Sequence, residues 1–159
     1  MKVLRSIEEL QNLIGYDFSN PNLLETARTR RKYCEEITKS NIDENMNPLA
    51  TVGDAVLDTI VLTRLYNEGR RKVGSLTDEK KRIIDKSRTF ALAKEHNYHE
   101  FVRWGIGEER DTIWMTKPRT FDTCIEALVG AVYMDATNNK RNGIKSAELV
   151  LDRLGFEFN

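Results

Sequence analysis

The sequence has few cysteines, prolines and histidines, and it has no long apolar run. It contains two cysteines, three prolines and two histidines in 159 residues. Cys34 and Cys124 lack the close spacing of a metal-binding motif, and Cys124 lies in an apolar segment, which favours a small buried thiol. No stretch approaches the roughly 20 apolar residues of a membrane span, and residues 1–9 carry acids where a secretion signal would be apolar. These absences predict a cytoplasmic protein that does not cross a membrane.

The sequence also lacks an excess of either charge. It has 25 basic and 25 acidic residues, so no field of the whole molecule would attract nucleic acid, and any basic footprint must be local. The length suits one core, and the 40% content of hydrophobic residues is enough to build it. We therefore expect a single domain over residues 1–159.

Helical periodicity and helix caps recur along the chain, whereas the alternation typical of strands is almost absent. Ser6 and Glu9 have the spacing of a capping box, and Asn20 precedes Pro21 as a cap precedes a first helical residue. Further helices are predicted over about 48–67, from 77 through 93, over 121–136 and over 146–154. Loops are predicted over 38–47 and 105–118. The sequence therefore predicts an all-α domain.

Two of the predicted helices are apolar nearly all round and yet contain acids. Asp54 lies in the first of them, and Asp122 and Glu126 lie in the second. An ionised acid in such a place costs several kcal/mol unless it is paired or coordinates a metal. The pattern predicts a divalent-metal site between the two helices. The alternative is a set of ordinary buried acids, each paired with an arginine or capping a helix.

Five segments, taken in order, resemble the catalytic domain of the ribonuclease III family. They are residues 14–24, 53–57, 74–77, 105–109 and 126–133. The Gly-Asp-Ala-Val-Leu run at 53–57 matches the centre of the family signature, and 126–133 matches the second catalytic helix. Each motif alone is weak, but their order and spacing extend over nearly the whole chain. The resemblance implies an all-α, ribonuclease III-like helical domain that forms a homodimer.

The resemblance also implies a chemistry, the Mg²⁺-dependent hydrolysis of double-stranded RNA. Family members place four acids around the metal, which lowers the pKa of a bound water and neutralises charge on the phosphate. Two of these acids match Asp54 and Glu126, which we expect to be catalytic. The other two positions fall on Ala50 and Thr123, so half of the family's acids are replaced.

Helix spacing offers a substitute for one of the lost acids. Asp122 lies four residues before Glu126, and positions three or four apart share a helical face. We therefore expect Asp54, Asp122 and Glu126 to hold Mg²⁺, with Mn²⁺ as a substitute. Mg²⁺ commonly binds through only one or two carboxylates and keeps several waters, so the reduced set is compatible with metal binding.

A basic run stands where the family usually has a polar segment with a histidine. The candidate RNA-binding residues of this run are Arg28, Arg30, Arg31 and Lys32. Their charge would strengthen contacts with RNA phosphates. The alternative is a solvated helix face, because acids such as Glu25 and Glu35 flank the run. The same alternative applies to the basic runs at 70–72 and 80–82, which alternate with acids.

The sequence is compatible with three functions. Asp54, Asp122 and Glu126 favour a double-stranded RNA endonuclease. Ala50 and Thr123 favour a catalytically impaired dimer, either an RNA-binding protein or a structural component of a ribonucleoprotein. Detection of metal in the site would separate the first function from the other two.

The resemblance implies two kinds of partner. Val56, Ile60 and Phe90 are apolar beyond what one small core requires, so we expect an isologous homodimer contact through them. Bacterial members of the family append a double-stranded RNA-binding domain, which this sequence is expected to lack. Its grip on RNA would then come from the dimer surface or from a separate RNA-binding partner protein.

Overall fold

A computed structural model describes residues 3–39 and 41–158, and these residues are mostly helical. The helices are α1 (Ile7–Ile14), α2 (Pro21–Ala27), α3 (Arg31–Tyr33), η1 (Cys34–Thr38, a π-helix), α4 (Asn47–Asn67), α5 (Val73–Ile83), α6 (Lys86–Glu95), η2 (Tyr98–Phe101, a 3-10 helix), α7 (Ile106–Arg110), α8 (Ile113–Thr116), α9 (Arg119–Asn138) and α10 (Gly143–Leu154). Within the described residues, β pairing is limited to one isolated bridge between Thr29 and Arg103. The predicted all-α class is confirmed.

Side chains near the N-terminus fix the first two helices as the sequence predicts. The hydroxyl of Ser6 accepts a hydrogen bond from the Glu9 backbone N–H, and the Glu9 carboxylate accepts one from the Ser6 N–H. Gly15 ends α1 with a φ of 67°, a left-handed conformation that favours glycine. Asn20 caps α2, whose first residue is Pro21.

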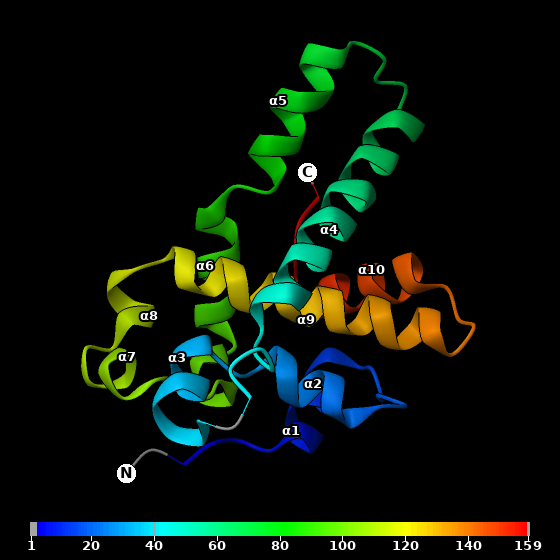
Figure 1. Cartoon of the computed structure of the whole chain (residues 1–159). Coiled ribbons are helices and arrows are strands. Elements are labelled where there is room, and N and C mark those ends of the chain that lie inside the picture. The colour runs from blue at the N-terminus through cyan, green and yellow to red at the C-terminus, as the bar shows by residue number, and fades with distance from the viewer. Residues whose placement is uncertain (1–2, 40, 159) are drawn as a thin grey trace.

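Helix α9 lies at the centre of the core, where α4 crosses it (Figure 1). Its buried side chains point to every side, so other helices cover it nearly all round. Cys124 on α9 is fully buried, and burial raises the pKa of its thiol to about 12. The prediction of a buried thiol is confirmed for this residue. The core of the described chain therefore forms around one apolar helix.

A buried carboxylate fastens the N-terminal segment to the later part of α9. Asp135 is fully buried and accepts hydrogen bonds from the Tyr16 hydroxyl at 2.8 Å and from the backbone N–H groups of Ser19 at 3.0 Å and Asn20 at 2.8 Å. Arg141 pairs with the same carboxylate at 3.2 Å. These contacts compensate the cost of burying the charge. Burial and the hydrogen bond to Asp135 raise the pKa of Tyr16.

Two helix starts and one predicted loop differ from the sequence prediction. Helix α5 begins at Val73, and the Thr77 hydroxyl donates to the Val73 carbonyl inside the helix instead of capping its start. Helix α10 begins at Gly143 because Asn142, rather than Ser146, provides the cap. The predicted loop over 105–118 contains the short helices α7 and α8.

The second half of α4 and helix α5 form a hairpin that projects from the helical body (Figure 1). Val56 and Ile60 on α4 are buried in the core of the single chain, with exposed fractions of 5% and 1%. The prediction that these two residues form a surface for a second copy is therefore wrong, since their side chains are already covered. Among the described residues, no helix is long and apolar enough to cross a membrane.

Candidate active site

A cavity of about 470 Å³ lies where α4 and α9 approach each other beside α6. Its lining includes the three predicted acids, Asp54, Asp122 and Glu126. It also includes Ala50 and Thr123, the positions where the family places its other two acids. The structure thus brings all five positions to one cavity, which we call the acid cavity.

The three acids differ in their exposure to solvent. Asp122 has an exposed fraction of 7%, Glu126 is half-buried and Asp54 is exposed. The sequence interpretation of Asp54 as a buried acid is therefore wrong. Helix α4 packs on α9 through Gly53 and its neighbours, which leaves the next residue, Asp54, at the rim of the acid cavity. An exposed carboxylate at a rim is accessible to a ligand.

Two glycines allow α4 and α9 to touch through their backbones. A Cβ atom at Gly53 would lie 1.7 Å from the Glu126 carbonyl oxygen, and one at Gly130 would lie 2.0 Å from the Leu49 carbonyl oxygen. Both separations are far below van der Waals contact, so no larger residue fits without movement of a helix. This close crossing fixes the distance between the helices that carry Asp54 and Glu126. The sequence signal is a glycine immediately before one acid and another four residues after the second.

The chemistry of the acid cavity suits a hard divalent cation, because carboxylate oxygens are the ligands that Mg²⁺ and Mn²⁺ prefer. The arrangement of the side chains is looser than a finished metal centre. Within residues 3–39 and 41–158, no group of three or more His, Cys, Asp or Glu side chains is arranged to hold a metal ion. Because Mg²⁺ keeps several waters and needs only one or two carboxylates, the residues present still fit such an ion. Metal binding by Asp54, Asp122 and Glu126 stays a prediction.

The four candidate RNA-binding residues differ in exposure. Arg28 is buried and Arg30 is partly buried, whereas Arg31 and Lys32 are exposed. The guanidinium of Arg28 is almost fully buried, donating to the Glu25 carboxylate at 2.9 and 3.0 Å and to the Arg5 carbonyl at 2.6 Å. Arg30 donates to the Glu108 carboxylate at 2.7 Å. These pairs leave 5% of the Arg28 side chain and 18% of the Arg30 side chain exposed, and phosphate contact through Arg28 and Arg30 stays a prediction. Their role in the structure is to pair with acids of the same chain.

The second pair, Arg31 and Lys32, is exposed on α3. Both side chains pair with Glu35 one turn later, at 2.8 and 3.2 Å. These contacts lower the pKa of Glu35 through hydrogen bonds from Lys32 and Arg31. The alternative of a neutralised, solvated face describes this arrangement, and exposed pairs of this kind exchange partners at little cost. RNA binding by Arg31 and Lys32 stays a prediction.

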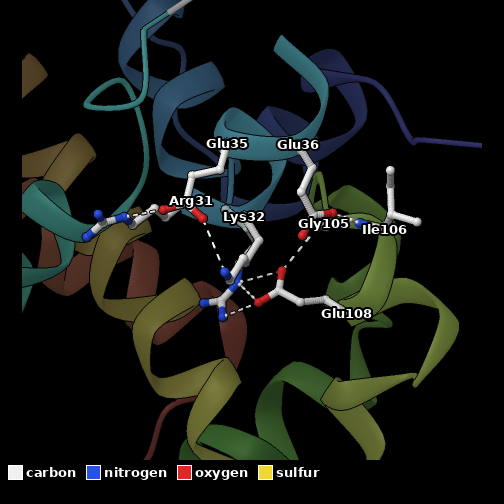
Figure 2. Close-up of polar contacts among 8 residues, drawn as sticks. Arg31, Lys32, Glu35, Glu36, Gly105, Ile106 and Glu108 are labelled. Atoms are coloured by element: carbon white, nitrogen blue, oxygen red, sulfur yellow. Dashed lines mark hydrogen bonds and ion pairs between the residues drawn. The ribbon is translucent and has the colours of Figure 1, made fainter. Parts of the chain in front are cut away.

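Glu36 of η1 holds the start of α7 (Figure 2), and Glu108 both caps α7 and pairs with Arg30, the residue before α3. The Glu36 carboxylate accepts a hydrogen bond from the Ile106 N–H at 2.7 Å, and the Glu108 carboxylate accepts one from the Gly105 N–H at 3.1 Å. A Cβ at Gly105 would lie 2.5 Å from the Lys32 Cβ, so the chain passes very close there. The sequence predicted a loop motif at residues 105–109 and no structural role for its acids. Their contacts fix the start of the segment that leads into α9.

A second hollow, which the sequence analysis did not anticipate, lies between α4 and the end of α5. It has a volume of about 650 Å³ and is lined by Asp54, Asp58, Lys80, Lys81, Arg82, Ile84 and Asp85. Asp54 and Ile84 also line the acid cavity, so the two spaces are neighbours. We call this second space the α5 hollow. In the sequence, the basic residues at 80–82 alternate with acids in the same way as the run at 70–72. The packing of α5 against α4 is what distinguishes them.

Comparisons with known proteins agree with the geometry of the acid cavity. Residues 47–137, which contain α4, the cavity and most of α9, match the family model of the ribonuclease III domain. The chain belongs to the ribonuclease III domain family. The resemblance seen in the sequence is therefore confirmed. The matched region covers Asp54, Asp122 and Glu126 together with the replaced positions Ala50 and Thr123.

Individual relatives extend this assignment over most of the chain. Ribonuclease 3 of Listeria monocytogenes is 32% identical over 150 residues, which are 94% of this chain and 62% of the relative. Ribonuclease 3 of Bdellovibrio bacteriovorus is 33% identical over 129 residues, which are 80% of this chain and 54% of the relative. The match to this chain thus spans 62% and 54% of the length of these relatives. The predicted lack of an appended RNA-binding domain stays a prediction.

Solved structures of the same family have the same fold. A nuclease domain of ribonuclease III from Campylobacter jejuni superposes with a TM-score of 0.78 and 25% identity, covering 94% of this chain and 95% of that domain. A second structure of that domain gives a TM-score of 0.74 at the same identity. The first of these structures shows flexibility in a region involved in its own dimer formation.

Proposed function

We propose that this ribonuclease III domain is a metal-dependent endonuclease that cuts double-stranded RNA in the cytoplasm and works as a homodimer. The observation that carries the proposal is the gathering of Asp54, Asp122 and Glu126 around one cavity at the crossing of α4 and α9. Family membership supports the same reaction, since the chain matches ribonuclease 3 proteins and the nuclease domain of one of them.

The chemistry proposed for the acid cavity is hydrolysis of a phosphodiester bond. A bound Mg²⁺, or Mn²⁺ in its place, supplies a water of lowered pKa and neutralises charge on the phosphate. Asp54 and Glu126 would hold the ion, and Asp122 adds the third negative charge. The close crossing at Gly53 and Gly130 fixes the two helices that present these carboxylates. This preorganisation matters because errors of about an ångström in position can cost on the order of a hundredfold in rate.

The replaced positions favour one alternative function. Ala50 and Thr123 line the acid cavity and contribute no charge to it. With these two acids lost, the domain would serve as a catalytically impaired dimer that binds RNA or forms part of a ribonucleoprotein. Binding of duplex RNA without metal-dependent cleavage would support this alternative. A separate RNA-binding partner protein stays a prediction in either case.

The proposed activity is tested by following cleavage of a long, perfectly paired RNA with and without Mg²⁺. We expect slow cutting that requires metal, and we expect Asp54→Asn or Glu126→Gln to lower the rate at least about tenfold, roughly 1.4 kcal/mol of barrier. Asp43→Asn, which changes an exposed acid in the loop before α4, is the matched control and should leave the rate unchanged. Cutting that survives the loss of both Asp54 and Glu126 would show that the active site lies elsewhere.

A further inference from the structure

The α5 hollow places basic side chains beside the acid cavity. Its lining combines acids of α4 with Lys80, Lys81 and Arg82 near the end of α5, and it shares Asp54 and Ile84 with the acid cavity. Asp54 and Asp58 are one helical turn apart, about 6 Å along α4. A linear polymer that contacts the acid cavity can therefore contact the α5 hollow with its next repeating unit.

One ion pair within the hollow involves both of its helices. The Lys80 ammonium donates to the Asp58 carboxylate at 2.9 Å, and the two side chains are 24% and 35% exposed. A partly exposed pair of this kind contributes little to stability, because water screens it and ordering it costs side-chain entropy. The pair is therefore weak enough to exchange when a better anion arrives.

A phosphate group is a better anion than Asp58 for this ammonium group. It offers several strong acceptor oxygens, and contact with it releases condensed counterions from the nucleic acid. An RNA strand carries a phosphate at every nucleotide. Because the two spaces share Asp54 and Ile84, a strand that places one phosphate at the acid cavity and continues toward α5 would place a neighbouring phosphate at the α5 hollow.

We propose that the α5 hollow receives a neighbouring phosphate of the bound RNA strand. When no phosphate is bound there, Asp58 pairs with the Lys80 ammonium group. Asp58 thus acts as an internal competitor that weakens RNA binding until the strand displaces it. This inference rests on the proposed function. It assigns a phosphate contact to Lys80, whereas Arg28 and Arg30 are paired with acids of the same chain. It also differs from the sequence interpretation of residues 80–82 as a solvated face.

The test measures affinity for a short RNA duplex over a range of salt concentrations, without divalent cation, so that no cleavage occurs. We expect Lys80→Gln to weaken binding about fivefold and to lower the slope of log affinity against log salt by about one. We expect Asp58→Asn to strengthen binding about threefold, because it frees the ammonium group. Lys145→Gln and Asp152→Asn on α10 are the matched controls, since these residues also form ion pairs but line neither space.

The double variant separates competition from a general charge effect. If Asp58 acts by occupying Lys80, the gain from Asp58→Asn disappears in the Lys80→Gln background. A gain that persists there would overturn the inference, as would unchanged affinity in Lys80→Gln alone. Neither result would contradict the proposed cleavage activity, which is measured separately in Mg²⁺. If the unaltered chain shows no salt-sensitive binding of the duplex, both the inference and its basis are overturned.

Discussion

At the scale of single residues, the acid cavity differs from the family pattern by two missing carboxylates. The resemblance implies Asp54 and Glu126, and the rule of helix spacing adds Asp122, so sequence reasoning selects three acids that line one cavity. The exposure of these residues could not be predicted in the same way. Asp54 lies in an apolar run, yet the glycine before it provides the contact with α9 and leaves the carboxylate at the rim.

The missing carboxylates can be restored to test whether they limit the reaction. Ala50→Glu combined with Thr123→Asp would place two more acids in the same cavity, because both positions already line it. We expect metal-dependent cleavage of duplex RNA to rise at least about tenfold, roughly 1.4 kcal/mol of barrier. We also expect Mg²⁺ to raise the melting temperature more in the double variant than in the unaltered chain, because a tighter ion stabilises more.

Two results would contradict this expectation. A double variant that gains metal-dependent stability but leaves RNA intact would locate the defect in RNA binding rather than in the carboxylates. A variant that gains neither would show that Ala50 and Thr123 do not face the metal. The single changes serve as controls, since each restores one acid.

At the scale of elements, local signals predict most helices and fail where tertiary contacts decide. The caps at Ser6 and Asn20 give the first two helices directly. The threonine at position 77 has a capping pattern in sequence, but α5 starts four residues earlier, so Thr77 lies inside the helix. The basic run at 28–32 could not be interpreted from sequence alone, because the partner of Arg30 is Glu108, far along the chain.

The crossing of α4 and α9 allows a sharp test by one methyl group. Gly130→Ala adds a Cβ 2.0 Å from the Leu49 carbonyl oxygen, so the helices must separate. We expect a loss of about 1–3 kcal/mol in the free energy of unfolding, measured with urea, because overpacking outweighs the better helix propensity of alanine. We also expect slower cleavage, since the acids of the two helices move apart.

A second glycine provides the matched control for this change. Gly74 lies in α5 with open space around its Cβ position. Gly74→Ala should therefore be neutral or should stabilise the protein by up to about 1 kcal/mol. If Gly130→Ala were as well tolerated as Gly74→Ala, the close crossing would not be what sets the distance between the helices.

At the scale of the whole molecule, two of the three residues that the sequence suggested for the homodimer contact are buried within one chain, and the third, Phe90, is half-buried. Val56 and Ile60 belong to the core of one chain, and a count of apolar residues cannot distinguish a core from an interface. The Campylobacter jejuni domain has a region involved in its own dimer formation, whereas the homodimer of this chain stays a proposal.

Light scattering of the purified protein tests the assembly directly. We expect a mass about twice the 18.4 kDa of one chain at micromolar concentration. The mass should fall toward that of one chain on dilution, because association depends on concentration. A mass of 18.4 kDa throughout the micromolar range would contradict the homodimer.

The buried carboxylate of Asp135 has a consequence for how the chain is made. Its hydrogen-bond donors Tyr16, Ser19 and Asn20 are synthesised 119, 116 and 115 residues before Asp135. At about 5–20 residues per second, the N-terminal segment waits roughly ten seconds for its acceptor. The apolar side chains of α1 and α2 stay uncovered during that interval. Final docking of the segment that contains Tyr16, Ser19 and Asn20 therefore has to follow the synthesis of α9.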